Sequence, residues 1–296
     1  MKAFATSAEK SKAIDSAIKH NDFPLLRQYC VSKYGLVSDR IRIKVWPKLL
    51  GLTTDSDLPS NVPASKLKTS YEHQITVDIL RSLNSFDLVK GISQEARRVR
   101  ALQLTRVITR IVSEDTSLHY FQGFHDICSV FLLVAGEELG YRLIRRFVYT
   151  YCRDAMRPSF DLTSRLMALI PLVIRAVDVP LYEQLLALQQ EMPMFALSWV
   201  LTYFAHVVPS FEKVTRIFDF CIGTHPLSIL YLSAALIIDH REATFKMHDL
   251  SDIHNLFSRV LSRVDWDEAC LSSESLLVAV PPQLLLKQLT ADLPFE

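Results

Sequence analysis

The chain of 296 residues is long enough for one large domain or two modest ones, and 49% apolar with 22% charged residues place it among soluble globular proteins. Its 33 basic and 32 acidic residues nearly cancel, so the overall charge gives no reason to expect a nucleic-acid partner. The polar stretch after Met1 lacks the apolar run of a secretory signal, so a cytosolic protein is expected.

The five cysteines are odd in number, widely spaced and form no C-x-x-C pair. Four of them lie in apolar segments, so we expect reduced core thiols, in keeping with a reducing compartment. They are Cys30, Cys128, Cys152, Cys221 and Cys270. The histidines are not at ligand spacing with one another or with a cysteine, and no metal site is predicted.

The N-terminal part predicts three short amphipathic helices, over residues 11–20, 23–33 and 41–50. Gly35 fits a C-terminal cap for the second helix, and Gly51 fits the end of the third. Within the third helix, Arg42 and Trp46 lie four residues apart on one face, where a guanidinium can lie against an indole. We expect a structural role for this pair.

A polar stretch over residues 52–69 predicts a surface loop inside one domain. Helices are then expected over residues 71–83 and 93–112. The second of these carries five arginines, for which a solvated face is the main interpretation and an acidic partner surface the alternative. They are Arg97, Arg98, Arg100, Arg106 and Arg110.

The rest of the chain predicts a succession of helices and no convincing strand. The expected ranges are 124–135, 141–153, 164–177, 181–190, 195–208, 211–222, 226–241, 250–263, 267–280 and 282–291. Two uncharged runs, 192–211 and 220–238, are long enough to cross a bilayer. Their prolines and polar residues favour buried core helices, so we predict no membrane span and an all-α fold.

Two short motifs contain the candidate chemistry. Residues 75–81 read I-x-x-D-x-x-R, with Asp78 and Arg81 on neighbouring rows of one helix face. Residues 120–126 read Y-x-Q-G-x-x-D. Taken alone, the first motif is a surface ion pair and the second is a loop. In this order, after R-x-x-x-W at Arg42 and Trp46, they resemble the signature of TBC-domain Rab GTPase-activating proteins.

The resemblance implies an arginine finger at Arg81 and a glutamine finger at Gln122, which together complete the active site of a GTP-bound Rab. An arginine presents a planar, permanently charged fork to phosphate oxygens, and a glutamine amide both accepts and donates. Asp78, Tyr120, Gly123 and Asp126 are supporting candidates: Asp78 to hold Arg81, Gly123 to allow close approach, and Asp126 to cap or brace the loop.

The chain contains no G-x-x-x-x-G-K-[ST] loop, so GTP and Mg²⁺ are expected to come with the Rab, with no cofactor of its own and no hydrolase activity without the partner. Later segments, F-A-L-S-W at 195–199 and R-I-F-D at 216–219, are similar to further blocks of the family. The resemblance implies one TBC domain over 1–296, with an N-terminal helical extension and two packed subdomains over about 1–155 and 156–296.

Two rival hypotheses are a catalytically silent TBC scaffold that binds Rabs and an unrelated all-α interaction protein. The stretches His125-Asp126-Ile127 and His225-Pro226-Leu227 look most like the TBC branch at the endoplasmic reticulum, which acts on early-secretory Rabs. That likeness implies a place at the cytosolic face of the endoplasmic reticulum or early secretory membranes. Members of that branch carry a C-terminal membrane anchor, which is expected outside this chain.

Overall fold

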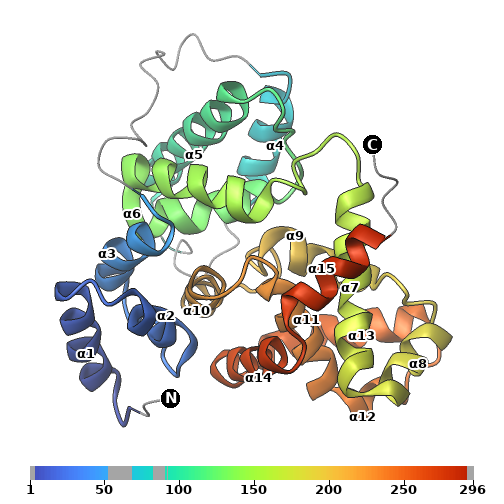
Figure 1. The fold of residues 1–296 in the computed structure, drawn as a ribbon. Coiled ribbons are helices and arrows are strands. Elements are labelled where there is room, and N and C mark those ends of the chain that lie inside the picture. The colour runs from blue at the N-terminus through green and yellow to red at the C-terminus, as the bar shows by residue number, and fades with distance from the viewer. Residues whose placement is uncertain (1–3, 53–68, 83–90, 92, 292–296) are drawn as a thin grey trace.

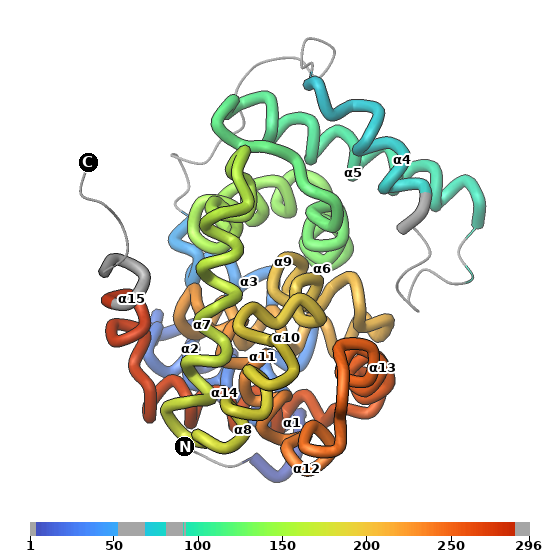
Figure 2. Tube along the Cα trace, turned by 90° about the vertical axis from the view of Figure 1, so that its right-hand side faces the viewer, coloured from blue at the N-terminus to red at the C-terminus, as the bar shows by residue number. Residues whose placement is uncertain are grey.

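The structure is a computed structural model that describes residues 4–52, 69–82, 91 and 93–291. Over these ranges the chain forms helices and no strand, which confirms the all-α prediction. Figures 1 and 2 both place α4 and α5 side by side at one end of the molecule and α12 and α14 toward the other.

The N-terminal helices are α1 (Ser7–Lys19), α2 (Phe23–Val31) and α3 (Asp39–Leu49). Helix α1 begins four residues before the predicted start, because the Thr6 side chain accepts from the backbone N–H of Glu9 and caps it. The prediction that Gly35 caps α2 is wrong. Helix α2 ends at Val31 with Ser32 as its cap, and Gly35 (φ +49) instead passes close to Asp219, whose Oδ2 would lie 2.6 Å from an added Cβ.

The next three helices are α4 (Glu72–Ser82), α5 (Gln94–Glu114) and α6 (Phe124–Phe147), which pack against one another. The predicted break between the helices over 124–135 and 141–153 is present within α6, because Gly136 leaves the helical conformation there. Helix α6 continues through a kink at Gly136 (φ 74°, ψ −175°) and runs into a π-helical turn, η3 (Val148–Cys152). Glycine has no Cβ to obstruct this conformation, so Gly136 divides α6 into two helical parts at the kink.

The remaining chain folds into further helices, several of which pack on α11. They are α7 (Asp161–Val177), α8 (Val179–Ala187), η4 (Met194–Ala196), α9 (Leu197–Thr202), α10 (Phe211–Gly223), α11 (Ser228–Asp239), α12 (Arg241–Thr244), α13 (Leu250–Val260), η5 (Leu261–Arg263), α14 (Trp266–Ala279) and α15 (Pro282–Ala291). Helix α11 is buried over ten consecutive residues and packs against α7, α9 and α14. One uncharged run of the sequence is therefore a core helix.

The predicted helix over 195–208 is wrong in its second half. Helix α9 ends at Thr202, because Tyr203 (φ 52°) and Phe204 (φ 62°) adopt the left-handed region that cannot continue an α-helix. Among the described residues, the helices lack the combination of length and apolar character that crossing a lipid bilayer requires.

Helix α10 packs on α2, α3 and α6 as well as on α11 and α14, so segments far apart in the sequence share one core (Figure 1). At its centre the ring of Phe218 stacks on Phe147, with ring centroids 5.6 Å apart, and meets Phe131 edge-on at 5.4 Å. All five cysteines lie buried as free thiols, as predicted. The division into subdomains near residue 155 stays a prediction.

Candidate functional site

Gln122 lies at the tip of a tight turn that leads into α6. The turn is closed by two backbone hydrogen bonds, from Phe124 N to Phe121 O (3.1 Å) and from Asp126 N to Gly123 O (3.0 Å). The Gln122 side chain is exposed. Because its own backbone hydrogen bonds fix the turn, the Gln122 amide can be presented to a docked partner without any rearrangement of the turn.

Gly123 is required at this turn for two separate reasons. Its φ of +103° lies in a region that L side chains rarely adopt. A Cβ built on its backbone would also lie 2.6 Å from Cγ2 of Thr202, the last residue of α9. The turn that carries Gln122 thus rests directly on α9, and only glycine permits that approach.

Asp78 is buried on α4, with 2% of its surface exposed, and accepts hydrogen bonds from two side chains. The Tyr120 hydroxyl donates to its Oδ2 at 2.9 Å, and the Gln74 amide donates to both oxygens at 3.2 and 3.3 Å. Arg81 lies in the last turn of α4, but its side chain is outside the part that the structure describes. The expected bond from Asp78 to Arg81 therefore stays a prediction.

Tyr120 joins the two motifs. Its hydroxyl donates to Asp78 and also lies 3.0 Å from Nδ1 of His125. Burial, followed by the neighbouring Asp78 carboxylate, raises the pKa of Tyr120 far above its ordinary value, so the hydroxyl keeps its proton. The helix that carries Arg81 and the turn that carries Gln122 are consequently linked by a buried hydrogen bond.

Asp126 follows the turn within the first residues of α6 and is 1% exposed. The expected cap is not what its side chain provides, since α6 has Gly123 at the N-cap without a side-chain hydrogen bond. One carboxylate oxygen is instead 2.8 Å from Nδ1 of His206, and the other is 3.4 Å from Nε2 of His125. Asp126 thus ties the start of α6 to the segment after α9.

The pKa values of the two histidines beside Asp126 are shifted in opposite directions. Burial lowers the pKa of His125, and the Asp126 and Asp78 charges oppose that shift only in part. The hydrogen bond to Asp126 raises the pKa of His206, whose side chain is half exposed. The sequence did not single out His206 for this site, because it lies 80 positions from Asp126. Its only signal is a titratable residue in an otherwise uncharged run.

Arg42 and Trp46 meet at the buried carboxylate of Asp219 on α10. The Arg42 guanidinium donates to Asp219 at 3.0 to 3.2 Å, and the Trp46 indole N–H donates to the same side chain at 2.9 Å. Burial alone would lower the pKa of Arg42, but Asp219 raises it. Three residues of two sequence blocks, R-x-x-x-W and R-I-F-D, therefore form one structural centre away from the Gln122 turn.

Two of the predicted arginines on α5 bind acids of the same chain. Arg106 forms a fork with the Glu137 carboxylate, with both N···O distances 2.7 Å, and Arg110 donates to Glu114 at 2.9 Å. The Arg106 pair is consistent with the solvated face that was the main interpretation, whereas the Arg110 pair is partly buried, with side chains 23% and 17% exposed. Within the described ranges, no group of three or more histidine, cysteine or acidic side chains is placed to hold a metal ion.

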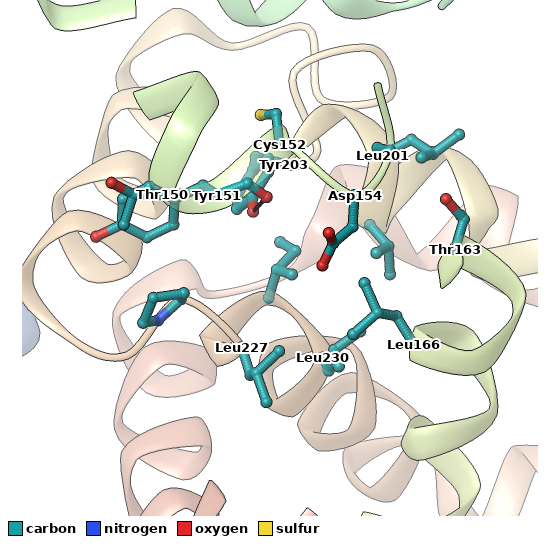
Figure 3. Close-up of a pocket in the computed structure, with 14 residues that line it drawn as sticks. Thr150, Tyr151, Cys152, Asp154, Thr163, Leu166, Leu201, Tyr203, Leu227 and Leu230 are labelled. Carbon is teal, nitrogen blue, oxygen red and sulfur yellow. Dashed lines mark hydrogen bonds between the residues drawn. The ribbon is translucent and has the colours of Figure 1, made fainter. Parts of the chain in front are cut away.

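A cavity of about 120 Å³ lies between η3, α7, α9 and α11. Four leucines belong to its lining, and Figure 3 shows the Asp154 carboxyl group pointing toward Leu166 and Leu230. Tyr203, the residue after α9, forms part of the wall beside Tyr151 and donates its hydroxyl hydrogen to the Tyr151 carbonyl oxygen at 2.9 Å. Tyr203 in the cavity wall thus directly follows Thr202, the residue that approaches Gly123.

Comparison with known proteins gives a consistent result. Residues 39–245 match the Rab-GTPase-TBC domain family. The chain is 31% identical over 285 residues to TBC1 domain family member 20 of Bos taurus, a match that covers 96% of this chain and 70% of that protein. It is 31% identical over 236 residues to the GTPase-activating protein gyp10 of Schizosaccharomyces pombe, covering 79% of this chain and 62% of that protein.

Solved structures share the fold. The Ypt/Rab-GAP domain of Gyp1p superposes with a TM-score of 0.70 at 13% identity, covering 92% of this chain and 98% of that one. The Chlamydomonas flagellar RabGAP TBC domain gives a TM-score of 0.62 at 16% identity, covering 92% and 96% of the two chains. At such low identity the likeness establishes the arrangement of helices and nothing about individual side chains.

Proposed function

Because this chain belongs to the Rab-GTPase-TBC domain family, we propose that it accelerates GTP hydrolysis by a Rab-family GTPase by inserting Arg81 and Gln122 into the partner's active site. The observation that carries the proposal is the buried Tyr120–Asp78 hydrogen bond of 2.9 Å. It joins the helix of Arg81 to the turn of the exposed Gln122. Two side chains that act on one phosphate group must be held at a fixed distance and orientation to each other.

The chemistry asks for two contributions that a GTPase supplies poorly by itself. Charge develops on the transferring phosphoryl group, and a planar guanidinium can neutralise it with two parallel hydrogen bonds. An arginine finger contributes on the order of 10³ to 10⁵ in rate, which is roughly 4 to 7 kcal/mol of barrier. A glutamine amide can accept a hydrogen bond from the attacking water while it donates to a neighbouring oxygen. GTP and Mg²⁺ would be supplied by the Rab.

The proposal extends to the partner and its location. The stretches His125-Asp126-Ile127 and His225-Pro226-Leu227 support a GTP-bound Rab of the early secretory pathway, met at the cytosolic face of the endoplasmic reticulum. A hydrolysis screen over purified GTP-loaded Rabs tests this choice. The largest acceleration is expected with an early-secretory Rab, and a maximum with an endosomal Rab would contradict it.

Substitution of the two fingers tests the mechanism on the Rab that responds. Arg81→Ala is expected to remove most of the acceleration, about 10³-fold on the scale of known arginine fingers, and Arg81→Lys to restore little of it. Gln122→Ala should also remove most stimulation. Arg40→Ala is the matched control, because Arg40 is an arginine of α3 whose side chain is 64% exposed.

A catalytically silent scaffold predicts a different pattern. In that case Arg81→Ala and Gln122→Ala would bind and affect the Rab as the wild type does. A Rab whose own switch glutamine is replaced offers a second discrimination, since it should remain at least partly responsive if Gln122 supplies the missing amide. Complete loss of response would make Gln122 a structural residue only.

A further inference from the structure

Directly behind the Gln122 turn lies a short segment, residues 202–206, which we call the strap. The first and the last residue of the strap both contact the turn or the residues that follow it. The Thr202 methyl group occupies the space beside Gly123, and His206 Nδ1 lies 2.8 Å from Asp126. We propose that the strap sets the position of the Gln122 turn, and that His206 is a positioning residue for the two fingers.

The strap is built as a rigid support. Tyr203 and Phe204 are consecutive non-glycine residues with φ of 52° and 62°, a conformation that persists only when its surroundings impose it. Neighbouring residues hold both Tyr203 and Phe204 in this conformation. The Tyr203 hydroxyl is bound to the Tyr151 carbonyl oxygen, as Figure 3 places these residues side by side, and the Phe204 ring stacks on Trp199 with centroids 5.4 Å apart.

A series of neighbouring polar side chains, hydrogen-bonded except between Asp126 and His125, leads from the strap to α4, the helix that carries Arg81. His206 meets Asp126 at 2.8 Å, Asp126 lies 3.4 Å from His125, His125 lies 3.0 Å from Tyr120, and Tyr120 donates to Asp78 at 2.9 Å. The series includes Tyr120, which precedes Gln122, and His125 and Asp126, which follow it. It ends on α4, one turn before Arg81.

The protons in this series explain why His206 matters. Tyr120 has one hydroxyl hydrogen and gives it to Asp78, so its oxygen must accept from Nδ1–H of His125. A neutral His125 then has no proton on Nε2, the atom that faces Asp126. Among the described side chains, His206 is therefore the donor that satisfies the buried Asp126 carboxylate.

Loss of that donor would leave a buried carboxylate without a hydrogen-bonding side chain, which is unfavourable enough to make the start of α6 move toward water. Gln122 precedes Asp126 by four residues and its exposed side chain takes its position from the turn. A shift of the turn would separate the amide from the attacking water. This inference rests on the proposed function, because it assumes that Gln122 acts in hydrolysis.

Two substitutions of His206 separate the donor from the ring. In His206→Asn the side-chain amide nitrogen stands as many bonds from Cβ as Nδ1 does, so the donor to Asp126 is kept without a titrating group. In His206→Leu the donor is lost and an apolar side chain remains. His240→Leu is the control, since His240 is a partly buried histidine that bonds the Leu236 carbonyl of the preceding turn, meets the Phe257 ring edge-on and has no contact with Asp126.

The first measurement is the rate of GTP hydrolysis by the responsive Rab, with this protein added at saturating and at limiting concentrations. His206→Leu is expected to lower kcat about tenfold with KM within about twofold, because misplaced catalytic groups slow the reaction more than they weaken docking. His206→Asn and His240→Leu should stay within about twofold of the wild type. A wild-type kcat in His206→Leu would overturn the inference, and so would an equal loss in His206→Asn.

The second measurement needs no Rab. Amide hydrogen exchange is followed over residues 119–126 and over α4, in samples whose helicity by circular dichroism matches the wild type. His206→Leu should speed exchange in both segments, and His206→Asn should not. Unchanged exchange in His206→Leu would refute the role of the strap. If the wild type stimulates no Rab, the proposed function fails, while exchange still decides whether the strap holds the turn.

Discussion

At the scale of single residues, Gly123 has the strictest requirement in the candidate site, since it combines a φ of +103° with the Thr202 methyl 2.6 Å from any added Cβ. We predict that Gly123→Ala destabilises the fold by about 1–3 kcal/mol and lowers Rab stimulation. Equilibrium denaturation by guanidinium chloride measures the first effect, and a hydrolysis assay measures the second.

Two further variants separate strain from contact. Gly91 has the same φ of +103° with no described atom within 4 Å of an added Cβ, so Gly91→Ala serves as the comparison for the backbone cost. Adding Thr202→Ser to Gly123→Ala removes the obstructing methyl and should recover part of the stability. If Gly123→Ala and Gly91→Ala lower the free energy of unfolding by the same amount, the contact between Gly123 and the strap adds nothing to the effect of Gly123→Ala.

The histidines beside Asp126 predict a specific pH response. The pKa of His206 is raised by Asp126, so its contribution to stability is complete below the ordinary histidine pKa of about 6.5 and is lost as the pH rises through the raised value. The stability difference between wild type and His206→Asn should therefore shrink with rising pH.

Histidine NMR titrations check the signs directly. His206 should titrate above the ordinary value and His125 below it, because burial lowers the pKa of His125. Asp126→Asn should move the His206 midpoint downward. An unchanged His206 midpoint in that variant would show that the bond to Asp126 is not formed in solution.

The sequence located most of this site but not its internal connections. Gln122, Gly123 and Asp126 stand within one motif, so their shared turn follows from local spacing. The hydrogen bond from Tyr120 to Asp78 spans 42 positions, and that from His206 to Asp126 spans 80. Such contacts depend on how helices pack, which the spacing of polar residues in one segment does not specify.

At the scale of elements, α3 and α10 are held together by the ion pair between Arg42 and Asp219. Asp219 is fully buried, and Arg42 is nearly so. We predict that Asp219→Asn costs roughly 3–5 kcal/mol of stability, since it removes the buried counter-charge of the Arg42 guanidinium and leaves only the half-exposed Asp39. Denaturant titration followed by helicity measures the change in the free energy of unfolding.

Asp39 provides the matched control for that experiment. It also binds Arg42, at 2.7 Å, but its side chain is 43% exposed. Water can replace this partner, so Asp39→Asn should cost less than about 1 kcal/mol. If both substitutions lower the free energy of unfolding equally, burial of the Arg42–Asp219 pair does not strengthen the packing of α10 on α3.

Helix existence was predictable from apolar periodicity, whereas some helix ends were not. Ser210 caps α10 and Ser93 caps α5, and both helices begin within one residue of the expected position. Helix α9 stops at Thr202 because packing holds Tyr203 and Phe204 in left-handed conformations. No residue preference signals that stop, since aromatic residues are not typical of such positions.

At the scale of the whole molecule, burial of all five cysteines makes thiol reactivity a measure of global opening. Burial raises the pKa of each, and a pKa of about 11 leaves on the order of 10⁻⁴ of Cys270 as thiolate at pH 7. We predict negligible labelling by a thiol reagent in native buffer and five reacted thiols in guanidinium chloride. A thiol that reacts at once in native buffer would contradict this burial.

The succession of apolar helical segments without a convincing strand predicted the all-α class, and the uncharged run over 220–238 was correctly assigned to the core. What composition does not contain is the order in which helices meet in space. Helix α11 becomes central because α7, α9 and α14 each present an apolar face to it. Helix α10 similarly collects partners from both halves of the chain.

The contacts of α10 also determine when the protein can finish folding during its synthesis. Arg42 must wait for Asp219, which follows it by 177 residues, and the carbonyl oxygen of Cys30 waits for Arg216 across 186 residues. At about 5–20 residues per second, translation of this interval takes roughly 10 to 40 seconds. Throughout that time the apolar faces of α2 and α3 lack their final partner, so the nascent chain is a natural client for chaperones that bind near the ribosome.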